Sequence, residues 1–304
     1  MKKESTLAYI SATLYAFIIG LSFLFVKITL SITTPLDILA HRFTVSIIFA
    51  SIPMIFGWVK LDIKVKDIIN IIPVALFYPV IFFTFQALGL VYISSSEAGI
   101  IQATLPIFTM VLSKFILKEN CSRFQKSFLF LSTLGVIYIF FMKGTSFNVS
   151  SLKGCLLILL STISSAIYNI LARKTTRKYK PLDLTYMITF VGFISFNFLN
   201  LTNHIISGTV STYFNPLTNS MFLVSILYLG LISSLIASLL SNYSLFKIGA
   251  AEVSVFSNFA TLITVISGII FLNEKLEYFH ILGGLIILVG VIGTNLYAIR
   301  DKKM

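Results

Sequence analysis

Charged residues are scarce in this 304-residue chain, of which 11% is Asp, Glu, Lys or Arg while 57% is hydrophobic. A soluble domain of ordinary composition carries about a quarter charged residues. Helical apolar runs of roughly 20 residues are long enough to cross the hydrocarbon core of a bilayer. The shortage of charge therefore excludes an ordinary soluble domain. It predicts an all-α, polytopic membrane protein that is surrounded by the lipid bilayer.

Cysteine and histidine are also rare, with two and three residues respectively. Cys121 and Cys155 have no metal-ligand spacing, and the histidines are scattered at positions 41, 204 and 280. The sequence contains no HExxH or GxSxG motif and no nucleophile–base constellation of an enzyme. It therefore predicts no enzyme activity, no catalytic residue, no metal and no cofactor.

Acidic residues number only 11, against 23 basic ones, so the formal net charge is +12. If the chain crosses the membrane ten times, eighteen of the 23 basic residues fall on the side that holds both termini. This distribution follows the positive-inside rule, whereas a nucleic-acid-binding fold gathers basic residues on one face. We expect no nucleic acid partner. We expect a multi-pass protein of the cell membrane with both termini in the cytoplasm.

Apolar runs recur along the whole chain and are separated mostly by short connections. They predict ten membrane-spanning helices, at residues 7–29, 36–57, 68–90, 97–117, 124–142, 153–172, 182–206, 220–246, 252–272 and 278–299. The longest connection, residues 204–220, would lie outside the cell. The first run is longer than the apolar core of a signal peptide and lacks a small-residue cleavage site, so we interpret it as a span.

The sequence of the chain repeats itself once. Residues 90–137 align with residues 245–292 at a constant shift of 155, and this alignment pairs Glu97 with Glu252. A Pro-Leu-Asp tripeptide also returns, 146 residues after its first occurrence. Two glutamates in register are informative because the chain has only 11 acidic residues.

The repeat divides the ten predicted helices into two groups of five, at residues 1–147 and 148–304. Because five is odd, the second group must enter the membrane from the opposite face. Inverted repeats of this kind are common in secondary transporters, which bind their substrate between the repeats near the middle of the membrane. The repeat therefore favours transport over other membrane functions.

The first Pro-Leu-Asp tripeptide begins a predicted span. Thr34 suits the N-cap, Pro35 the first helical position, and Asp37 the first turn, where the helix dipole favours a negative charge. His41 and Arg42 lie about one turn further along. An arginine within a membrane is costly unless it reaches the interface or a partner, so Arg42 is a candidate functional residue; an interfacial anchor is the alternative.

Glutamates begin two other predicted spans. Glu97 and Glu252 each stand at the start of a span, and Ser94 precedes Glu97 by three residues, which is the spacing of a capping box. Helix capping is therefore the favoured role of these glutamates. The charged candidates at the membrane edges are Lys27, Asp37, His41, Arg42, Glu97 and Glu252.

The middle of every predicted span lacks aspartate and glutamate. A proton-coupled exporter of cationic drugs relies on a buried carboxylate, so this pattern disfavours that class. Neutral polar and aromatic groups occur at mid-depth instead. Each could simply bond to a neighbouring helix, but together they suit a neutral or zwitterionic small-molecule substrate. The candidates for binding it are Tyr15, Ser22, Tyr78, Gln86, Gln102, Tyr168, Asn169, Asn242 and Asn258.

Four segments of the sequence carry a recognisable pattern. They are "FIIGLSFLFVKITL", "PLDILAHRFTVSII", "ALGLVYISSSEAGIIQATLPIFTMVLSKFILKE" and, in the second half, "GAAEVSVFSNFATLITVISGIIFLNEK". These segments resemble the EamA-type branch of the drug/metabolite transporter superfamily, including its second-helix arginine at Arg42. The resemblance covers nearly the whole chain. It implies a bundle of ten helices that moves small metabolites, often amino acids, out of bacteria.

The repeat and the resemblance together predict a secondary transporter that exports a small polar metabolite by alternating access. Uptake of a small metabolite remains an alternative, as does a membrane scaffold or sensor that transports nothing. Gly283, Gly290 and Gly293 give the last predicted span a face of small residues. Such a face lets helices approach closely, either within the monomer or across a homodimer seam.

Overall fold

The computed structural model describes residues 2–63, 65–116, 123–144 and 149–301. Within these ranges all regular structure is helical, and helices occupy each of the ten predicted ranges. Six of the ranges hold one continuous helix each. These are α1 (Lys2–Leu30), α2 (Pro35–Ile55), α7 (Arg123–Gly144), α8 (Val149–Thr175), α9 (Pro181–Ile206) and α14 (Tyr278–Asp301).

The other four ranges hold helices that are interrupted. The third comprises α3 (Val65–Ala75), the π-helix η1 (Leu76–Ile81) and α4 (Phe82–Tyr92), and the fourth comprises α5 (Ser95–Gln102) and α6 (Leu105–Ile116). The eighth comprises α10 (Ser220–Leu227), the π-helix η4 (Tyr228–Ile236) and α11 (Ala237–Lys247). The ninth comprises α12 (Ala250–Val255) and α13 (Ser257–Leu272). Two short 3-10 helices, η2 (Val210–Thr212) and η3 (Asn215–Thr218), lie between α9 and α10.

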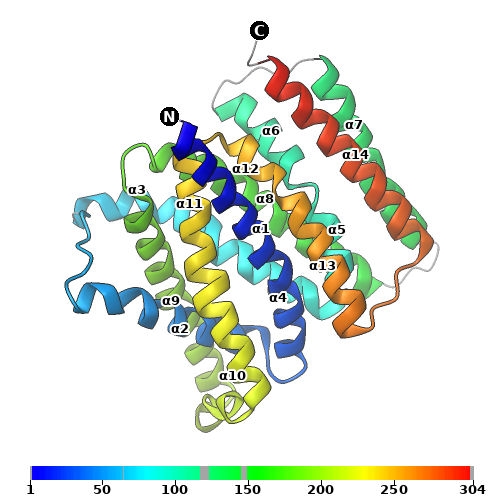
Figure 1. Cartoon of the computed structure of the whole chain (residues 1–304). Coiled ribbons are helices and arrows are strands. Elements are labelled where there is room, and N and C mark those ends of the chain that lie inside the picture. The colour runs from blue at the N-terminus through cyan, green and yellow to red at the C-terminus, as the bar shows by residue number, and fades with distance from the viewer. Residues whose placement is uncertain (1, 64, 117–122, 145–148, 302–304) are drawn as a thin grey trace.

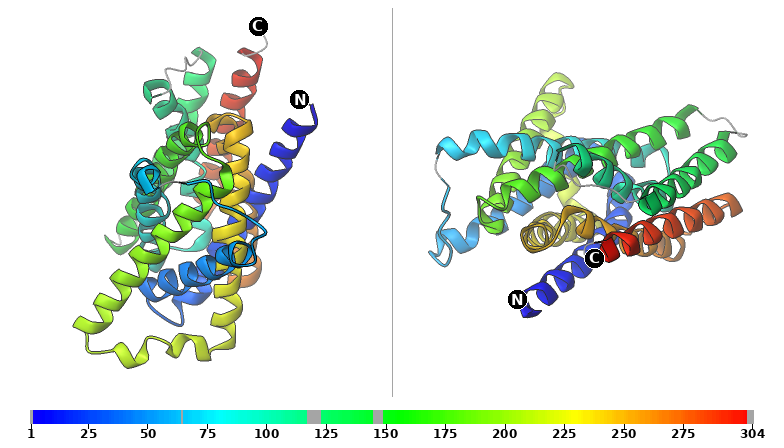
Figure 2. Two further views of the ribbon diagram at one scale, coloured as in Figure 1. Left: turned by 90° about the vertical axis from the view of Figure 1, so that its left-hand side faces the viewer. Right: turned by 90° about the horizontal axis from the view of Figure 1, so that it is seen from above.

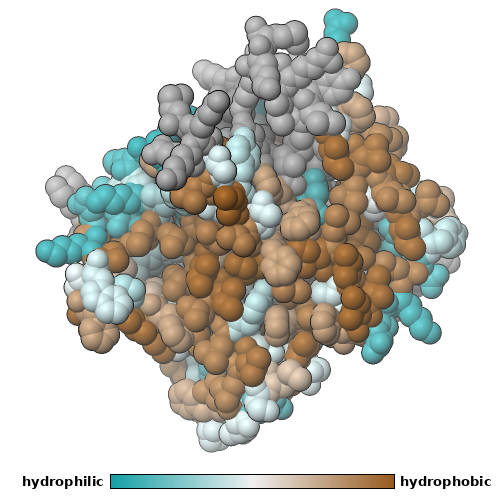
Figure 3. Space-filling model, in the orientation of Figure 1, coloured by the Kyte–Doolittle hydropathy of each residue, from teal (hydrophilic) through white to brown (hydrophobic). Residues whose placement is uncertain are grey.

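Many of these helices can cross a membrane. In the described part of the chain, seven helical segments are long and apolar enough to do so, and two shorter apolar helices span Ser257–Leu272 and Tyr278–Gly290. The surface of one face is apolar over a broad central area, with hydrophilic residues toward its margins (Figure 3). The protein is therefore a multi-pass membrane protein, while the count of ten crossings remains a prediction.

The interruptions recur at the spacing of the sequence repeat. A shift of 155 places η1 on residues 231–236, which lie within η4, and places the break between α5 and α6 beside the break between α12 and α13. In η1 the cause is local: Tyr78 adopts extended dihedral angles (φ −142°, ψ 113°) because the residue before a proline avoids the helical region. The two halves thus share their irregularities as well as their helices.

The helix contacts show the same two-fold relation. α1 packs against α11 and α13, and its counterpart α8 packs against α4 and α6, the counterparts of those helices. Counterparts also meet directly, in the pairs α2 with α9 and α7 with α14 (Figure 1). This pattern fits a fold of two repeats that are packed against each other.

Buried side chains from both halves share one interior. Phe43 of α2 and Phe196 of α9 lie in the same apolar cluster, with ring centroids 5.1 Å apart, and a second cluster includes Phe23 of α1 and Ala260 of α13. The start of α1 and the end of α14 lie at the same end of the molecule, and the segment between α9 and α10 lies at the opposite end (Figure 2).

The glycines of the last helix face its counterpart inside the molecule. A Cβ atom on Gly135 of α7 would lie 2.9 Å from the carbonyl oxygen of Gly283, and one on Gly293 would collide with Phe128 of α7. Small residues therefore allow α7 and α14 to pack closely. This face of α14 is occupied within the monomer.

Candidate functional site

Arg42 is fully buried, about one third of the way along α2. Its Nε donates to Ser234 Oγ at 2.6 Å, its Nη2 donates to Ser233 Oγ at 3.0 Å, and the guanidinium lies 4.0 Å from the centre of the Phe83 ring. Its Nη1 is buried without a hydrogen-bond partner. Among the described residues, no carboxylate forms an ion pair with Arg42.

The close approach of two helices brings Arg42 to these serines. A Cβ atom on Gly230 would lie 2.7 Å from the backbone oxygen of Arg42, so only glycine allows η4 and α2 to pack this tightly. Ser233 and Ser234 follow Gly230 by three and four residues and therefore lie on the same helix face. The π-helical segment thus presents two hydroxyl groups to the arginine side chain.

A chain of polar contacts links four helices beside this arginine. The ring of Tyr78 stacks on that of Tyr168 at 4.6 Å, and its hydroxyl lies 3.4 Å from Ser238 Oγ. The Tyr168 hydroxyl donates to Asn242 Oδ1 at 2.7 Å, and Asn242 Nδ2 donates to Thr185 Oγ1 at 2.9 Å. All five side chains are buried. Because Tyr78 belongs to the first half and the others to the second, this polar network lies at the interface of the two repeats.

Two other candidates lie on α1. Tyr15 is half-buried and lies near Tyr78 and Tyr168, so it borders the same network. Ser22 is buried and donates to the backbone oxygen of Ile19 in its own helix. The structure therefore brings Tyr15 toward the polar network and gives Ser22 a local partner.

Four amide side chains among the predicted site residues are buried and make no hydrogen bond with any described residue. Asn258 has both amide atoms buried and unpartnered. The side chains of Gln86, Gln102 and Asn169 make no hydrogen bond with any described residue. A polar group in an apolar interior is costly unless it finds a partner. These four amides therefore keep hydrogen-bonding capacity that no described residue uses.

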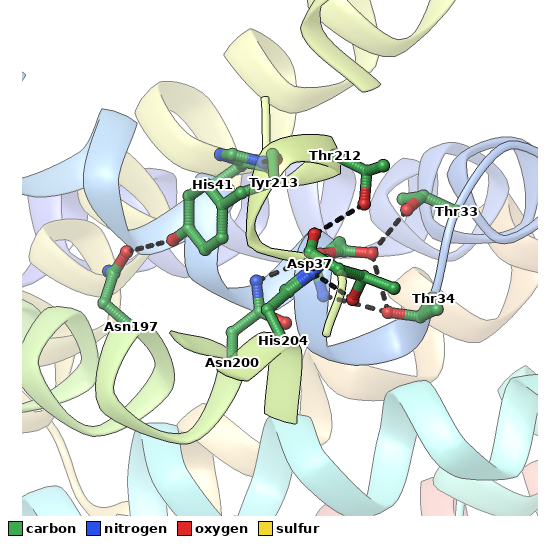
Figure 4. Close-up of polar contacts among 10 residues, drawn as sticks. Thr33, Thr34, Asp37, His41, Asn197, Asn200, His204, Thr212 and Tyr213 are labelled. Atoms are coloured by element: carbon green, nitrogen blue, oxygen red, sulfur yellow. Dashed lines mark hydrogen bonds and ion pairs between the residues drawn. The ribbon is translucent and has the colours of Figure 1, made fainter. Parts of the chain in front are cut away.

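A second polar cluster surrounds Asp37 near the end of the molecule that holds the segment between α9 and α10 (Figure 4). The Asp37 carboxylate lies 2.8 Å from His204 Nε2 and accepts hydrogen bonds from Asn200 Nδ2 at 3.0 Å, Thr33 Oγ1 at 2.6 Å and Thr34 Oγ1 at 2.8 Å. Thr34 also accepts from the Asp37 backbone N–H, so the predicted N-cap is confirmed. The cluster ties the start of α2 to the end of α9.

The segment between α9 and α10 folds onto this cluster. His41 Nε2 lies 3.0 Å from the backbone oxygen of Tyr213, and the Tyr213 hydroxyl donates to Asn197 Oδ1 at 2.7 Å. His204 Nδ1 lies 2.9 Å from the backbone oxygen of Thr209. Partial burial raises the pKa of the Tyr213 phenol above its ordinary value, so the phenol remains a hydrogen-bond donor at neutral pH, as an unperturbed phenol also would. These contacts tie the segment to both α2 and α9 at this end of the molecule.

Two basic residues cap helix ends at equivalent positions of the repeat. Lys27 Nζ donates to the carbonyl oxygens of Leu90 at 2.6 Å and Ile93 at 2.8 Å, where α4 ends. Arg173, 146 residues after Lys27, donates through Nη1 to the carbonyls of Leu245 and the next residue, where α11 ends. A cation at a helix C-terminus satisfies carbonyls that have no partner within the helix. The hydrogen bonds of Lys27 therefore stabilise the end of α4.

Glu97 also acts at a helix end. Its carboxylate accepts from the Ser94 backbone N–H at 3.2 Å while Ser94 Oγ accepts from the Glu97 N–H at 3.1 Å, which confirms the predicted capping box. Oε1 of Glu97 further lies 3.2 Å from His280 Nε2. The side chain of Glu252 lies outside the part of the chain that the structure describes.

Glu274 caps the same helix from the opposite half. Its two carboxylate oxygens accept hydrogen bonds from the backbone N–H and hydroxyl groups of Ser95 and Ser96, over 2.5 to 2.9 Å. Its counterpart at a shift of 155, Glu119, lies outside the described residues. The contact joins the connection after α13 to the start of α5.

Several residues of these clusters were not predicted from the sequence. They are Ser233, Ser234, Thr185, Asn200, His204 and Arg173. Two signals were present. Arg173 follows Lys27 by the 146 residues that separate the Pro-Leu-Asp tripeptides, and Ser233 and Ser234 are adjacent hydroxyl residues within an apolar run.

An open pocket of about 160 Å³ lies between α2, α9 and the helices η4 and α11. Its walls are mainly apolar and include Phe49, Pro53, Leu182 and Leu239, none of which is a predicted site residue. Thr185, which accepts a hydrogen bond from Asn242, also lines it. The pocket therefore adjoins the polar network at one point only.

Comparison with known proteins adds four findings. The sequence model of the EamA-like transporter family matches residues 6–141 and 152–296. A protein of Bacillus subtilis (strain 168) described as uncharacterized transporter YcxC is 53% identical over 303 residues, which cover 100% of this chain and 97% of that protein. An uncharacterized transporter of Archaeoglobus fulgidus is 27% identical over 273 residues, covering 90% and 92% of the two chains. A solved crystal structure aligns over 99% of both chains with a TM-score of 0.66 and 15% sequence identity, so it is similar in fold alone.

Proposed function

Because the chain belongs to the EamA-like transporter family, we propose that it is a secondary transporter that exports a small polar metabolite, such as an amino acid. The family and the named relatives are transporters, so the chain is a transporter and not an enzyme. The observation that carries the proposal is the buried polar network of Tyr78, Tyr168 and Asn242 between the two repeats. Secondary transporters built from repeats bind their substrates at such an interface.

Transport proceeds by alternating access between two inverted five-helix repeats, residues 1–147 and 148–304. The boundary between them falls outside the described residues. The two separate family matches, the shared helix interruptions and the reciprocal helix contacts support two repeats of this size. Ten crossings, five in each repeat, give the second repeat the opposite orientation.

The substrate binds among the buried amide and phenol groups at the interface. Asn258, Gln102 and Gln86 are buried and make no side-chain hydrogen bond with a described residue, so a substrate can supply the hydrogen bonds that these side chains lack. Tyr78 and Tyr168 add aromatic faces with hydroxyl groups. This combination suits a molecule with both polar groups and apolar surface.

The cluster around Asp37 acts as the closure at one end of the pathway. Asp37, His204 and Tyr213 join α2, α9 and the segment between α9 and α10 across the space between the repeats (Figure 4). Alternating access requires that one end be closed while the other is open. Breaking these contacts opens this end and reforming them closes it.

A metabolite-wide screen tests the function. Cells with and without the protein are compared for the metabolites in the medium and in the cytoplasm, and the metabolites that shift are then followed in proteoliposomes that contain the purified protein. The proposal predicts that at least one small polar metabolite accumulates in the medium of the expressing cells. Accumulation inside the cells would show an uptake permease instead. If purified protein moves none of the metabolites, a scaffold or sensor is the better explanation.

The orientation is proposed as both termini in the cytoplasm of a cell-membrane protein. It can be tested in a background without Cys121 and Cys155, by placing single cysteines at Thr209 and Thr175. These positions lie at opposite ends of α9, just beyond Ile206 and just before Pro181. An impermeant thiol reagent should label Thr209→Cys in intact cells and should label Thr175→Cys only after the cells are opened. The reverse pattern would overturn the orientation.

A further inference from the structure

The buried guanidinium of Arg42 has more donors than partners. A guanidinium carries five N–H donors. Arg42 donates through Nε to Ser234 and through Nη2 to Ser233, while Nη1 is buried with no partner. The two serines are neutral, so no described residue offsets the positive charge by an ion pair. An unpaired charge in a membrane protein interior is destabilising and marks a functional site.

Three other charged groups inside the described part of the molecule, Lys27, Arg173 and Asp37, are compensated. Lys27 and Arg173 each meet two carbonyl oxygens at a helix C-terminus, where the helix dipole supplies partial negative charge. Asp37 pairs with His204 and accepts three further hydrogen bonds from side chains. Arg42, in contrast, contacts two hydroxyl groups and an aromatic ring, which carry no negative charge. Its positive charge is therefore not neutralised by these contacts.

The environment of Arg42 does not recur in the second repeat. At the shift of 146, Arg42 corresponds to Ile188, and at the shift of 155, Ser233 and Ser234 correspond to Tyr78 and Pro79. If packing of a fold built from two repeats required a buried cation at this position, the second repeat would require one too. The position in the second repeat is filled by a buried isoleucine instead.

We propose that the transported substrate carries an oxyanion, a carboxylate or a phosphate, and that Arg42 binds it. The inference rests on the transport function proposed above and narrows its substrate class to acids and zwitterions. The anion approaches in the plane of the guanidinium, because the Phe83 ring covers one face and the serines occupy Nε and part of Nη2. Nη1 and the remaining N–H of Nη2 form the edge that binds oxyanions with two parallel hydrogen bonds.

The anion reaches Arg42 when η4 moves relative to α2. Arg42 is fully buried in this conformation, so the site is closed. The serines that hold it belong to a π-helical segment, and such segments within α-helices are frequent at functional sites. Alternating access provides the movement that exposes the guanidinium to one side of the membrane.

The first test compares the metabolite shifts of cells that express the wild-type protein, Arg42→Gln, Arg42→Lys or Ser46→Ala. Ser46 is the matched control, because it lies one turn beyond Arg42 on α2 and is also fully buried, with a hydroxyl that has no partner. Metabolites that the wild type exports should carry a carboxylate or a phosphate. Their flux per folded protein should fall at least tenfold in Arg42→Gln, recover in part in Arg42→Lys and stay unchanged in Ser46→Ala.

The second test requires no knowledge of the substrate. The unfolding temperature of the purified protein is measured in acetate, inorganic phosphate, chloride and the neutral acetamide at equal concentrations, with equal ionic strength among the salts. Acetate or phosphate should raise the unfolding temperature above that in chloride, acetamide should not, and the increase should be absent in Arg42→Gln. The anion that stabilises distinguishes a carboxylate from a phosphate substrate.

The outcomes separate this inference from the transport function. Export of metabolites that lack an acidic group, or undiminished flux in Arg42→Gln, would overturn the inference while leaving transport intact. The inference would also be overturned if neither acetate nor phosphate raised the unfolding temperature of the wild-type protein above that in chloride. If the wild type moves no metabolite yet shows stabilisation that depends on Arg42, the transport function fails and the anion site stands.

Discussion

The two halves of the chain are similar in their helix ends and different in their interior. Lys27 and Arg173 occupy equivalent positions and cap equivalent helices, α4 and α11. Arg42, on the other hand, corresponds to Ile188. We interpret the shared residues as the scaffold that both repeats need to fold, and the unshared residues as the groups that recognise a substrate.

A shared residue can still differ in its surroundings. Asp37 and Asp183 are both buried in the first turn of their helices. Asp37 bonds to four side chains, whereas Asp183 accepts, among the described residues, only from the Asp62 backbone N–H at 3.4 Å. An aspartate in the first turn is therefore common to both repeats, whereas the four side-chain contacts that we interpret as a closure belong to Asp37.

The largest effect is expected for the two basic caps. Lys27→Met and Arg173→Met each remove two charge-assisted hydrogen bonds to the carbonyls at a helix end, and each should lower the free energy of unfolding by roughly 3 kcal/mol. Chemical unfolding in mixed micelles measures it. If one variant were destabilised and the other were not, the two caps would not be equivalent parts of a common scaffold.

The next largest effect concerns the acidic cap. Glu274→Gln replaces one of two acceptor oxygens by a donor that faces the N–H groups of Ser95 and Ser96, so it should cost about 2 kcal/mol. The repeat predicts the same cost for Glu119→Gln. Thermal unfolding in detergent compares the two variants, with the exposed Glu277→Gln as a control. A neutral result for Glu119→Gln alone would show that the second helix start is capped differently.

A smaller difference is expected between the two aspartates. Asp37→Asn removes the charge that pairs with His204 and should cost about 1.5 kcal/mol, whereas Asp183→Asn should cost less than about 1 kcal/mol because it loses one weak hydrogen bond. Substrate flux should remain measurable in both variants, since the proposed mechanism needs no buried carboxylate. Loss of flux in folded Asp37→Asn protein would show that transport requires this carboxylate and would contradict the proposed mechanism.

The smallest effect on stability is expected at Asn258. Its amide atoms have no hydrogen-bond partner among the described residues, so Asn258→Leu should change the free energy of unfolding by no more than about 0.5 kcal/mol while lowering the rate of substrate transport. Asn242→Leu is the matched change, and it should destabilise by about 2 kcal/mol because it breaks bonds to Tyr168 and Thr185. Gln102→Leu should behave like Asn258→Leu. Equal destabilisation at positions 242 and 258 would show a packing role for both.

Local patterns predicted much of the fold. The ten apolar runs all contain helices, and the caps at Thr34 and Ser94 followed from residue type and spacing. The π-helical segments did not, because hydropathy is the same for an α-helix and a π-helix. For η1 the proline at position 79 was a signal, whereas η4 contains no proline or other residue that would have predicted it.

The candidate site was predicted less completely. Spacing along one helix shows which residues lie at mid-depth, but it does not show which side chains of other helices they meet. The contact of Arg42 with Ser233 and Ser234 joins residues about 190 positions apart, so no local pattern reveals it. The repeat was the one long-range signal in the sequence, and it points to shared contacts such as those of Lys27 and Arg173. By construction it cannot predict a contact that only one repeat makes.

The most direct test of this distinction is the flux of an exported metabolite per folded protein in Arg42→Gln and Arg173→Gln, each reconstituted in proteoliposomes. Arg173 belongs to the shared scaffold, and Arg42 to the unshared interior. Arg173→Gln should yield less folded protein, but the molecules that fold should transport at a rate close to that of the wild type. Arg42→Gln should fold as well as the wild type and transport at least tenfold more slowly. Equal loss of flux per folded molecule in both variants would contradict the account.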